Sequence, residues 1–402
     1  MQGIFMLYDL LCCFGSFDIL RDDFGLLRSE FPHTMFCVAG TQAMEASSNY
    51  IEIFKLSNIS GKTSGVRPAN NDPDTEGHSS DIDDNDEEEG GPGAPILQLR
   101  KVFHAGGVNR IRAMSQNPHI CASWADTGYF QVWDLSAHLN ALAESTAAVS
   151  NGAIAASNQA PLVKFKHEDE GYALDWSPLV PGRLVSGDCK SFIHLWEPTA
   201  GTTWNVDSNP FVGHKARVKD LQWSPTLPSV FASCSADGSV LIWDTRSGKS
   251  PPAIIMSHDA DEVDEAPGVN VISWNRLASQ MLAAGRDDGS FSIWDLRQHT
   301  DMLAHFEYHK HPITSIEWSP HENSKFAVSS SDNQLTIWDM LSPIHEEEES
   351  EFGSITDDEM DAPPYVHRGQ KDLKELHWHS QIPGMVISTE KDGFNVIIPT
   401  QT

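Results

Sequence analysis

The sequence predicts an all-β chain, a seven-bladed WD-repeat β-propeller, because the same strand ending recurs at a regular distance. Six apolar strands end alike: FQVWD (Phe130–Asp134), IHLWE (Ile193–Glu197), VLIWD (Val240–Asp244), FSIWD (Phe291–Asp295), LTIWD (Leu335–Asp339) and the degenerate FNVIIP (Phe394–Pro399). Successive tryptophans of these endings are 44 to 63 residues apart. Such a period is typical of propeller blades, each built from four antiparallel strands.

The unit from Gly213 to Arg246 has the parts of one blade in order. Apolar side chains alternate along Val240–Trp243, as a strand requires. Asp237-Gly238 before it suits a tight hairpin, because Gly accepts positive φ and Asp tolerates it. Other units repeat these parts, with Trp-Ser-Pro at 176–178, 223–225 and 318–320, and turn dipeptides at 288–289, 332–333 and 392–393. We therefore expect equivalent blades throughout the chain.

Two weaker units bring the number of blades to seven, and the chain is predicted to be a single domain, 1–402. Phe54 takes the Trp position in Tyr50–Lys55, and Ile398 takes it in the last unit. Little chain follows Ile398, so the last blade needs an outer strand from elsewhere. We expect the N-terminal stretch Ile4–Cys13 to close that blade and Ser16–Leu20 to begin blade 1.

Neither a signal peptide nor a membrane span is predicted. Asp9 interrupts the apolar stretch at the N-terminus, and no basic residue precedes that stretch. No apolar run reaches the length of a transmembrane helix.

The cysteines, at positions 12, 13, 37, 121, 189 and 234, show no CxxC spacing. Free thiols in strands point to a reducing, intracellular compartment.

The formal charge of −30 is concentrated in three segments. Asp72–Glu89 holds ten carboxylates, Glu346–Asp361 nine and Asp259–Glu265 five, together 24 of the excess negative charges. We predict disordered acidic insertions at 60–95 and 259–268 and an acidic Pro-Pro loop at 344–364. Their field would attract basic proteins and repel phosphate backbones, so we expect no direct nucleic-acid binding. The alternative is that these loops only confer solubility.

The sequence predicts no enzyme, no cofactor and no metal site. His309-Lys310-His311 and His377-Trp378-His379 resemble metal-binding pairs, but no further ligand completes either one. The recurring Ser, His and Asp residues are interpreted as a buried hydrogen-bonded set within each blade, such as His214, Asp237 and Trp243. Neither a Gly-rich phosphate loop nor Gly-x-Ser-x-Gly occurs.

Four longer stretches resemble the glutamate-rich WD-repeat proteins. They are His104–Met114, Asp169–Trp196, Phe306–Trp318 and Gln370–Gly384. The similarity extends from about Phe17 to Pro399. It implies a protein of the nucleus and nucleolus, with some in the cytoplasm, that assists assembly of the large ribosomal subunit. It also implies basic clients, a large-subunit ribosomal protein and core histones; we expect the protein itself to be monomeric.

A broader resemblance links the chain to the retinoblastoma-binding histone chaperones. In those proteins a histone helix lies between an N-terminal helix and an acidic loop that ends in Pro-Pro. Carboxylates can pair with Lys and Arg while prolines form a rigid apolar rim; the alternative is a simple spacer. The candidate client-binding residues are Glu346, Glu347, Glu348, Glu349, Glu351, Asp357, Asp358, Glu359, Asp361, Pro363 and Pro364.

Two departures from these families affect the interpretation. No helix corresponding to that of the histone chaperones precedes the closing strand, which suggests a short isoform or a truncated gene model. In that case the Pro-Pro loop acts alone or the histone groove is incomplete. Asp259–Pro267 also lengthens a loop where family repeats pass directly from His-Asp-Ala-Asp to Val-Asn-Val-Ile.

A second motif indicates a function of another class. Two strands end in Trp-Asp-x-Arg, with the residues Trp243, Asp244, Arg246 and Trp294, Asp295, Arg297. This resembles the motif by which WD-repeat proteins dock onto the propeller adaptor of cullin-based ubiquitin ligases. We expect both arginines at the rim of adjacent blades, available for charge-assisted contacts. The alternative is that each arginine only bridges two blades.

Overall fold

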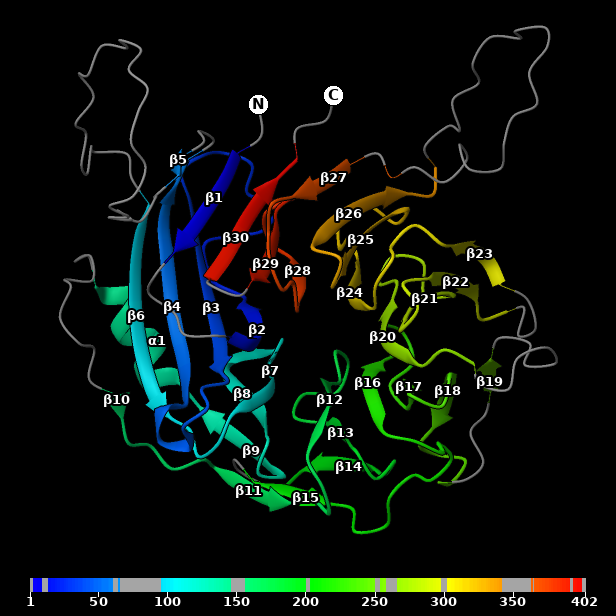
Figure 1. Ribbon diagram of the computed structural model, residues 1–402. Helices are drawn as coiled ribbons and strands as arrows, with labels where there is room; N and C mark the ends of the chain where they lie inside the picture. Colours follow the sequence, from blue (N-terminus) through cyan, green and yellow to red (C-terminus); the bar gives the residue numbers. More distant parts are fainter. Residues whose placement is uncertain are drawn as a thin grey trace, which may run out of the picture.

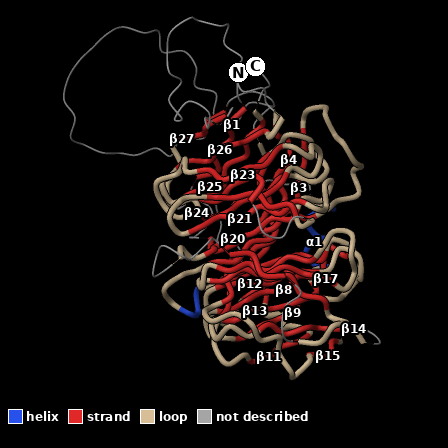
Figure 2. Tube along the Cα trace, turned by 90° about the vertical axis from the view of Figure 1, so that its right-hand side faces the viewer, coloured by secondary structure: helices blue, strands red, loops and turns tan. Residues whose placement is uncertain are grey.

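The computed structural model is a closed ring of seven β-sheets, which confirms the predicted seven-bladed propeller (Figure 1). The structure describes residues 3–8, 14–60, 64–65, 95–145, 156–199, 203–249, 254–257, 266–297, 302–341, 363, 365–390 and 393–399. The first strand of each blade lies nearest the centre of the ring. Seen from the side, the strands form the body of the ring and loops project from both faces (Figure 2).

The first three blades are each built on four strands, with three short additional elements. Blade 1 contains β2 (Phe14–Leu20), β3 (His33–Thr41), β4 (Tyr50–Ile59) and β6 (Ile96–Phe103), with the 3-10 turn η1 (Ala46–Ser48) between β3 and β4. Blade 2 contains β7 (Val108–Met114), β8 (Asn117–Ala125), β9 (Tyr129–Asp134) and β11 (Val163–Lys166), with α1 (Ser136–Glu144) after β9. Blade 3 contains β12 (Gly171–Trp176), β13 (Leu184–Asp188), β14 (Ile193–Pro198) and β15 (Trp204–Val206). The short strand β10 (Ala156–Ser157) pairs with β6.

The next three blades repeat the same order of strands. Blade 4 contains β16 (Val218–Trp223), β17 (Val230–Ser235), β18 (Ser239–Asp244) and β19 (Ile254–Ser257). Blade 5 contains β20 (Val269–Trp274), β21 (Met281–Arg286), β22 (Phe291–Asp295) and β23 (Met302–Phe306). Blade 6 contains β24 (Ile313–Trp318), β25 (Lys325–Ser330), β26 (Gln334–Asp339) and β27 (Tyr365–Arg368).

Blade 7 is completed by the N-terminus, as the sequence predicted. It contains β28 (Leu376–Trp378), β29 (Val386–Glu390) and β30 (Gly393–Ile398), and its outer strand is β1 (Gly3–Tyr8). β1 runs antiparallel to β30, with Gly3 opposite Ile398 and Tyr8 opposite Gly393. The expected closing strand was longer, but residues 9–13 lie outside the described residues. Pairing the two ends of the chain converts an open row of blades into a ring without free sheet edges at the junction.

A buried hydrogen-bonded set inside several blades confirms the structural interpretation of the recurring Ser, His and Asp. In blade 4, Ser233 Oγ lies 2.7 Å from His214 Nε2 and accepts the indole N–H of Trp243 at 2.8 Å. The other His214 nitrogen lies 3.2 Å from Asp237 Oδ2. Equivalent sets centre on His104, His167 and His309. In blade 4 this network joins Trp243 on the third strand to Ser233 on the second.

Seven interfaces between blades are each bridged at the inner strands by a side chain. In six of them a side-chain oxygen accepts a backbone N–H from the next inner strand: Asp18 from Ala113, Asp175 from Trp223, Gln222 from Trp274, Ser273 from Trp318, Glu317 from Trp378 and Glu375 from Phe17. Between blades 2 and 3, the Arg110 guanidinium instead donates to the Tyr172 carbonyl at 2.8 Å. These bonds align each inner strand with its neighbour.

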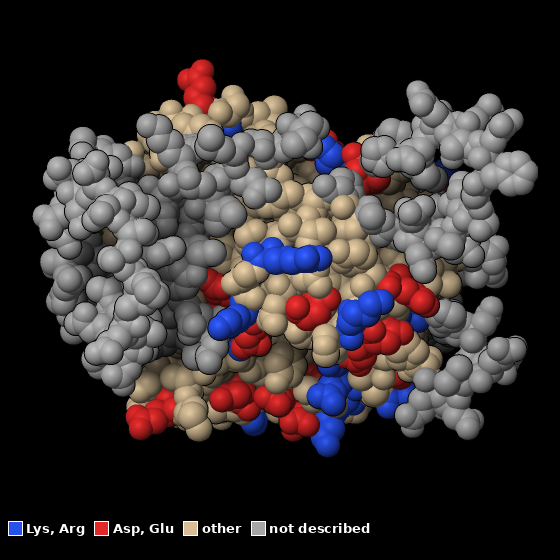
Figure 3. All heavy atoms as spheres, turned by 45° about the horizontal axis from the view of Figure 1, so that its top comes forward, with Lys and Arg blue, Asp and Glu red and all other residues tan. Residues whose placement is uncertain are grey.

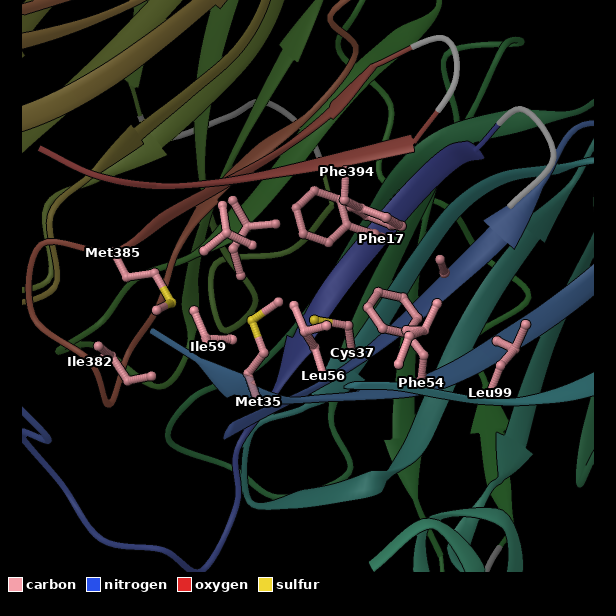
Figure 4. Packing of buried hydrophobic residues seen from close by; sticks show 14 residues of the cluster. Phe17, Met35, Cys37, Phe54, Leu56, Ile59, Leu99, Ile382, Met385 and Phe394 are labelled. Carbon is pink, nitrogen blue, oxygen red and sulfur yellow. The ribbon is translucent and has the colours of Figure 1, made fainter. Parts of the chain in front are cut away.

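Glu375 closes this ring between the last blade and the first. Its carboxylate lies 2.6 Å from both Arg110 and Arg112 of blade 2 and accepts the Phe17 N–H at 2.7 Å. Burial opposes ionisation, but the two guanidiniums hold the pKa of Glu375 well below its usual range. The apolar side of the same junction packs Phe17, Phe54 and Phe394 together with Met385 (Figure 4). Polar and apolar contacts thus coincide where the chain ends meet.

Among the described residues, no helix has the length and apolar character needed to cross a bilayer.

Replacing Glu375 with Gln should destabilise the ring strongly. The variant keeps the size of the side chain but leaves two partly buried guanidiniums without their anion. Removing one partner of a buried ion pair costs about 3–5 kcal/mol, and urea unfolding followed by tryptophan fluorescence measures that loss. The control Glu322→Gln breaks the more exposed pair with Lys325 and should cost less than about 1 kcal/mol. Equal losses in the two variants would contradict the role given to Glu375.

Candidate functional site

One face of the ring carries most of the features that distinguish this chain from a plain propeller. We call it the insertion face and define it as the face on which the first and third strands of every blade end. The register shows this in blade 1, where His33 at the start of β3 lies opposite Ile59 at the end of β4. In blade 4, Val230 lies opposite Asp244 in the same way.

Two of the three acidic segments are attached to the insertion face. Segment 60–95 connects β4 to β6, and segment 344–364 connects β26 to β27. Segment 259–268 connects β19 to β20 and is attached to the opposite face, because Ser257 at the end of β19 pairs with Ser239 at the start of β18. Blades 1 and 6 flank blade 7, so both large acidic segments begin and end beside that blade.

Almost all of the predicted client-binding residues lie outside the described residues. These are the nine carboxylates of 346–361 and Pro364; Pro363 is described and is partly buried. Within segment 60–95, Ser64–Gly65 form the short strand β5, which pairs parallel with β1. The disorder predicted for the three acidic segments is therefore not tested, except that these two residues are part of a sheet.

The loop between β2 and β3, residues 21–32, exposes an apolar surface on the insertion face. Phe24, Leu26, Leu27 and Phe31 are 58%, 63%, 64% and 46% exposed. Single exposed apolar side chains are ordinary, but four in one short loop are characteristic of interaction surfaces. We call these four residues the apolar loop.

The apolar loop is held in place by blade 7. Gln381, which is buried, donates from Nε2 to the carbonyls of Asp22 and Gly25 at 2.8 and 2.9 Å. Its Oε1 accepts the Asp22 N–H, and its carbonyl accepts the Arg28 N–H. Arg28 also pairs with Asp22 at 2.9 Å. The loop is thus a fixed platform between the attachment points of the two large acidic segments.

The central channel opens on the insertion face as a cavity of about 280 Å³. Loop residues that join first and second strands line its mouth, among them Arg21, Arg276 and Ser380. Deeper in the cavity lie Asp18, Asp175, Asp220, Glu317, Arg110 and Arg112. The carboxylates of this inner set accept backbone N–H groups from the next blade, so they hold the ring together.

Two channel residues have raised pKa values, for different reasons. Burial raises the pKa of Asp175 to about 7, against the hydrogen bond from the Trp223 N–H. Burial also disfavours protonated His377, but the nearby Glu317 and Glu375 carboxylates raise its pKa to about 9. The channel therefore carries Asp175 near the middle of its titration at neutral pH and a cationic His377.

Both Trp-Asp-x-Arg motifs end on the insertion face, in adjacent blades 4 and 5. Trp243 and Trp294 are buried. The arginine side chains are 74% and 71% exposed, and each pairs with the aspartate of its own motif: Arg246 with Asp244 at 2.7 Å and Arg297 with Asp295 at 2.5 Å. The hydrogen bond from Arg297 lowers the pKa of Asp295 to about 2. Both ion pairs lie within one turn, so they hold each guanidinium at the rim and do not bridge blades.

Comparisons with known proteins agree with this architecture. Residues 206–358 match the family model of the nucleolar protein 10-like N-terminal domain, a β-propeller. Over 404 aligned residues the chain is 58% identical to protein heat stress tolerant DWD 1 of Arabidopsis thaliana, covering 96% of this chain and 83% of that protein. It is 43% identical to glutamate-rich WD repeat-containing protein 1 of Dictyostelium discoideum, covering 95% of this chain and 77% of that protein.

This chain belongs to the family of glutamate-rich WD-repeat proteins. Ribosome assembly protein rrb1 of Schizosaccharomyces pombe is a further relative, 37% identical over 95% of this chain and 77% of that protein. The resemblance noted from the sequence is thereby confirmed.

The apolar loop was not predicted from the sequence. The sequence did contain a signal for it. FGLL and FP follow β2 closely, and their glycine and proline favour a turn, so apolar residues stand where a turn is expected. Only the three-dimensional structure shows that these side chains point away from the core. It also shows that they lie on the face to which the two large acidic segments are attached.

Replacing Asp175 with Asn should change how stability depends on pH. Between the ordinary aspartate pKa of 3.8 and the folded value of about 7, the folded chain holds a proton that the unfolded chain has lost. Wild-type stability therefore falls through this range relative to the variant, by at most about 1.4 kcal/mol per pH unit. Urea unfolding of both proteins from pH 5 to 8 measures the difference. A difference independent of pH would show that Asp175 titrates normally.

Proposed function

We propose that this protein is a non-enzymatic scaffold that binds basic proteins during assembly of the large ribosomal subunit, in the nucleus and nucleolus. The proposed clients are a large-subunit ribosomal protein and core histones. The name of the fission yeast relative, a ribosome assembly protein, supports the process. The observation that carries the proposal is the position of the apolar loop between the attachment points of two strongly acidic segments.

The two features have complementary roles in capturing a basic client. Nineteen carboxylates in Asp72–Glu89 and Glu346–Asp361 provide a field that attracts a cationic protein and increases its association rate. The described surface in Figure 3 shows acidic and basic side chains interspersed, without a comparably large region of one sign. The long-range negative field is therefore attributed to the two acidic segments.

The apolar loop supplies the contact that charge alone does not. Fully burying one Leu or Phe side chain contributes about 1.5–3 kcal/mol, and the loop is already ordered by Gln381. Little conformational entropy is then lost when a client covers it. A basic client with an apolar face would contact both the acidic segments and the apolar loop. Its positive charges would then be shielded until it reaches the ribosome precursor.

Neutralising the nine acids of Glu346–Asp361, by Glu→Gln and Asp→Asn, should weaken binding of a purified core histone. Fluorescence anisotropy in a salt series measures the effect. Wild-type affinity should fall steeply from 0.1 M to 1 M salt, as the Debye length decreases from about 10 Å to about 3 Å. The neutralised variant should bind more weakly at low salt and show a shallower salt dependence.

The matched control neutralises the five acids of Asp259–Glu265, a segment attached to the opposite face, and should leave binding close to that of wild type. The double variant Leu26→Ser/Leu27→Ser should reduce the binding that remains at high salt. If both neutralised variants lose affinity equally, only overall charge matters and the insertion face has no special role. If salt has no effect on the wild type, the acidic segments do not capture the client.

We infer a second candidate function, docking onto the propeller adaptor of a cullin-based ubiquitin ligase, from the two rim arginines. Arg246 and Arg297 are exposed, lie in adjacent blades and are held by their own aspartates. The two functions are compatible, because the rim motifs lie on blades 4 and 5 while the apolar loop lies between blades 1 and 7.

The double variant Arg246→Ala/Arg297→Ala should lose binding to the purified adaptor and keep its affinity for the histone. Loss of two charge-assisted contacts of about 1.5–3 kcal/mol each would reduce adaptor affinity by at least about tenfold. Arg217→Ala, an exposed arginine on the opposite face, is the control in the same pull-down. Unchanged adaptor binding by the double variant would exclude these arginines from docking.

A further inference from the structure

Blade 3 departs from the repeat at two positions that meet in space. In blades 4 and 6, the carboxylate beside the buried histidine comes from the turn after the second strand, at Asp237 and Asp332. In blade 3 the equivalent turn position is Lys190, and the carboxylate comes instead from Asp188, the last residue of β13.

The second departure is a histidine two residues before the third-strand Trp. Other blades have Gln131, Leu241, Ser292 and Thr336 at this position. Blade 3 has His194, and its ring lies beside that of His167, with 4.9 Å between the ring centroids. Neither departure is required by the strand pairing, since the other blades form the same sheet without them.

Three side chains consequently converge within a small volume. One ligand atom from each of His167, Asp188 and His194 lies within 4.8 Å of the other two. His167 Nδ1 and Asp188 Oδ2 are 3.5 Å apart, longer than the 3.2 and 2.9 Å between the corresponding atoms in blades 4 and 6. Both atoms are buried and have no hydrogen-bond partner. Such a pair is costly unless another group satisfies it.

The remaining nitrogens of both histidines are engaged elsewhere. His167 Nε2 lies 3.2 Å from Ser186 Oγ, and His194 Nδ1 lies 3.0 Å from the backbone carbonyl of Asp207. An N–H at these positions leaves His167 Nδ1 and His194 Nε2 unprotonated. Histidines that bind metals are oriented by this kind of outer hydrogen bond, which also fixes the tautomer.

Aromatic side chains cover one side of His167. Trp124 and Phe165 pack against it, with ring centroids 4.3 and 5.0 Å away. They leave the side that faces Asp188 and His194 for an ion. His194 is only partly buried, so an ion could enter from the surface on its side.

We propose that His167, Asp188 and His194 bind one divalent transition-metal ion, with Zn²⁺ as the best fit. Zn²⁺ accepts imidazole nitrogen and carboxylate oxygen at about 2.0–2.2 Å, and tetrahedral geometry then separates neighbouring ligand atoms by about 3.3 Å. The observed 3.5 Å between His167 and Asp188 agrees with that spacing. A ligand atom of the partly buried His194 lies within 4.8 Å of the other two and supplies the third ligand, and the fourth position is left for water. The ion takes the place of the short His–Asp hydrogen bond of blades 4 and 6.

Zinc binding by the untagged chain and by His194→Leu tests this site. Leucine is the residue that blade 4 has at this position, so the variant should fold. After treatment with a chelator, wild type should take up about one equivalent of Zn²⁺ in calorimetry, and Zn²⁺ should raise its melting temperature. Loss of one outer-shell partner already costs about 10–100-fold in affinity, so loss of a ligand should cost more than about 100-fold.

Co²⁺ substitution and two further variants decide the assignment. Co²⁺ should give the visible absorption bands of a tetrahedral site in wild type and in the control His311→Leu, an exposed histidine. The bands should disappear in His194→Leu and in Asp188→Asn. Equal zinc binding by wild type and His194→Leu would overturn the proposal and indicate adventitious binding, for instance to thiols. Absence of binding by wild type would show that His167 and Asp188 are an ordinary polar pair.

Discussion

Closure of the ring is the constraint on which the rest of this structure depends. Each blade buries apolar surface only against its two neighbours, so an open ring would leave two blades exposed. β1 closes the junction by pairing with β30. Glu375 closes it at the inner strands by joining Phe17 to Arg110 and Arg112. The buried charge is tolerated there because two guanidiniums and a backbone N–H surround one carboxylate.

Closure also separates structural chemistry from chemistry available to partners. The channel carboxylates accept backbone N–H groups from neighbouring inner strands, and in blade 4 the buried His–Ser–Trp set joins the third strand to the second. The loops at the ends of strands do not have to hold the ring together in this way. The first-to-second and third-to-fourth strand connections share one face, so insertions there collect on the same side even when they are far apart in sequence.

The sequence was sufficient to predict the parts of each repeat. The Trp-Asp endings, the hairpin dipeptides and the set formed by His214, Asp237 and Trp243 are local patterns, and the structure confirms them. His104 was missed because its inner strand lacks the Trp-Ser-Pro signal and has Ala113 at the Trp position. The apolar loop was missed because sequence does not distinguish an exposed Phe24 from a buried one. The convergence of His167, Asp188 and His194 depends on three separate strands and turns.

The sequence by itself determined the fold, the family and the uneven distribution of charge, because each of these is encoded in short repeats and in composition. The tertiary structure decided which of the inserted features act together. Strand direction places the attachment points of segments 60–95 and 344–364 on one face and those of 259–268 on the other. Blade order brings the apolar loop between the attachment points of the two large acidic segments. These relations depend on where a strand ends in a closed ring, and no local stretch of sequence specifies that position.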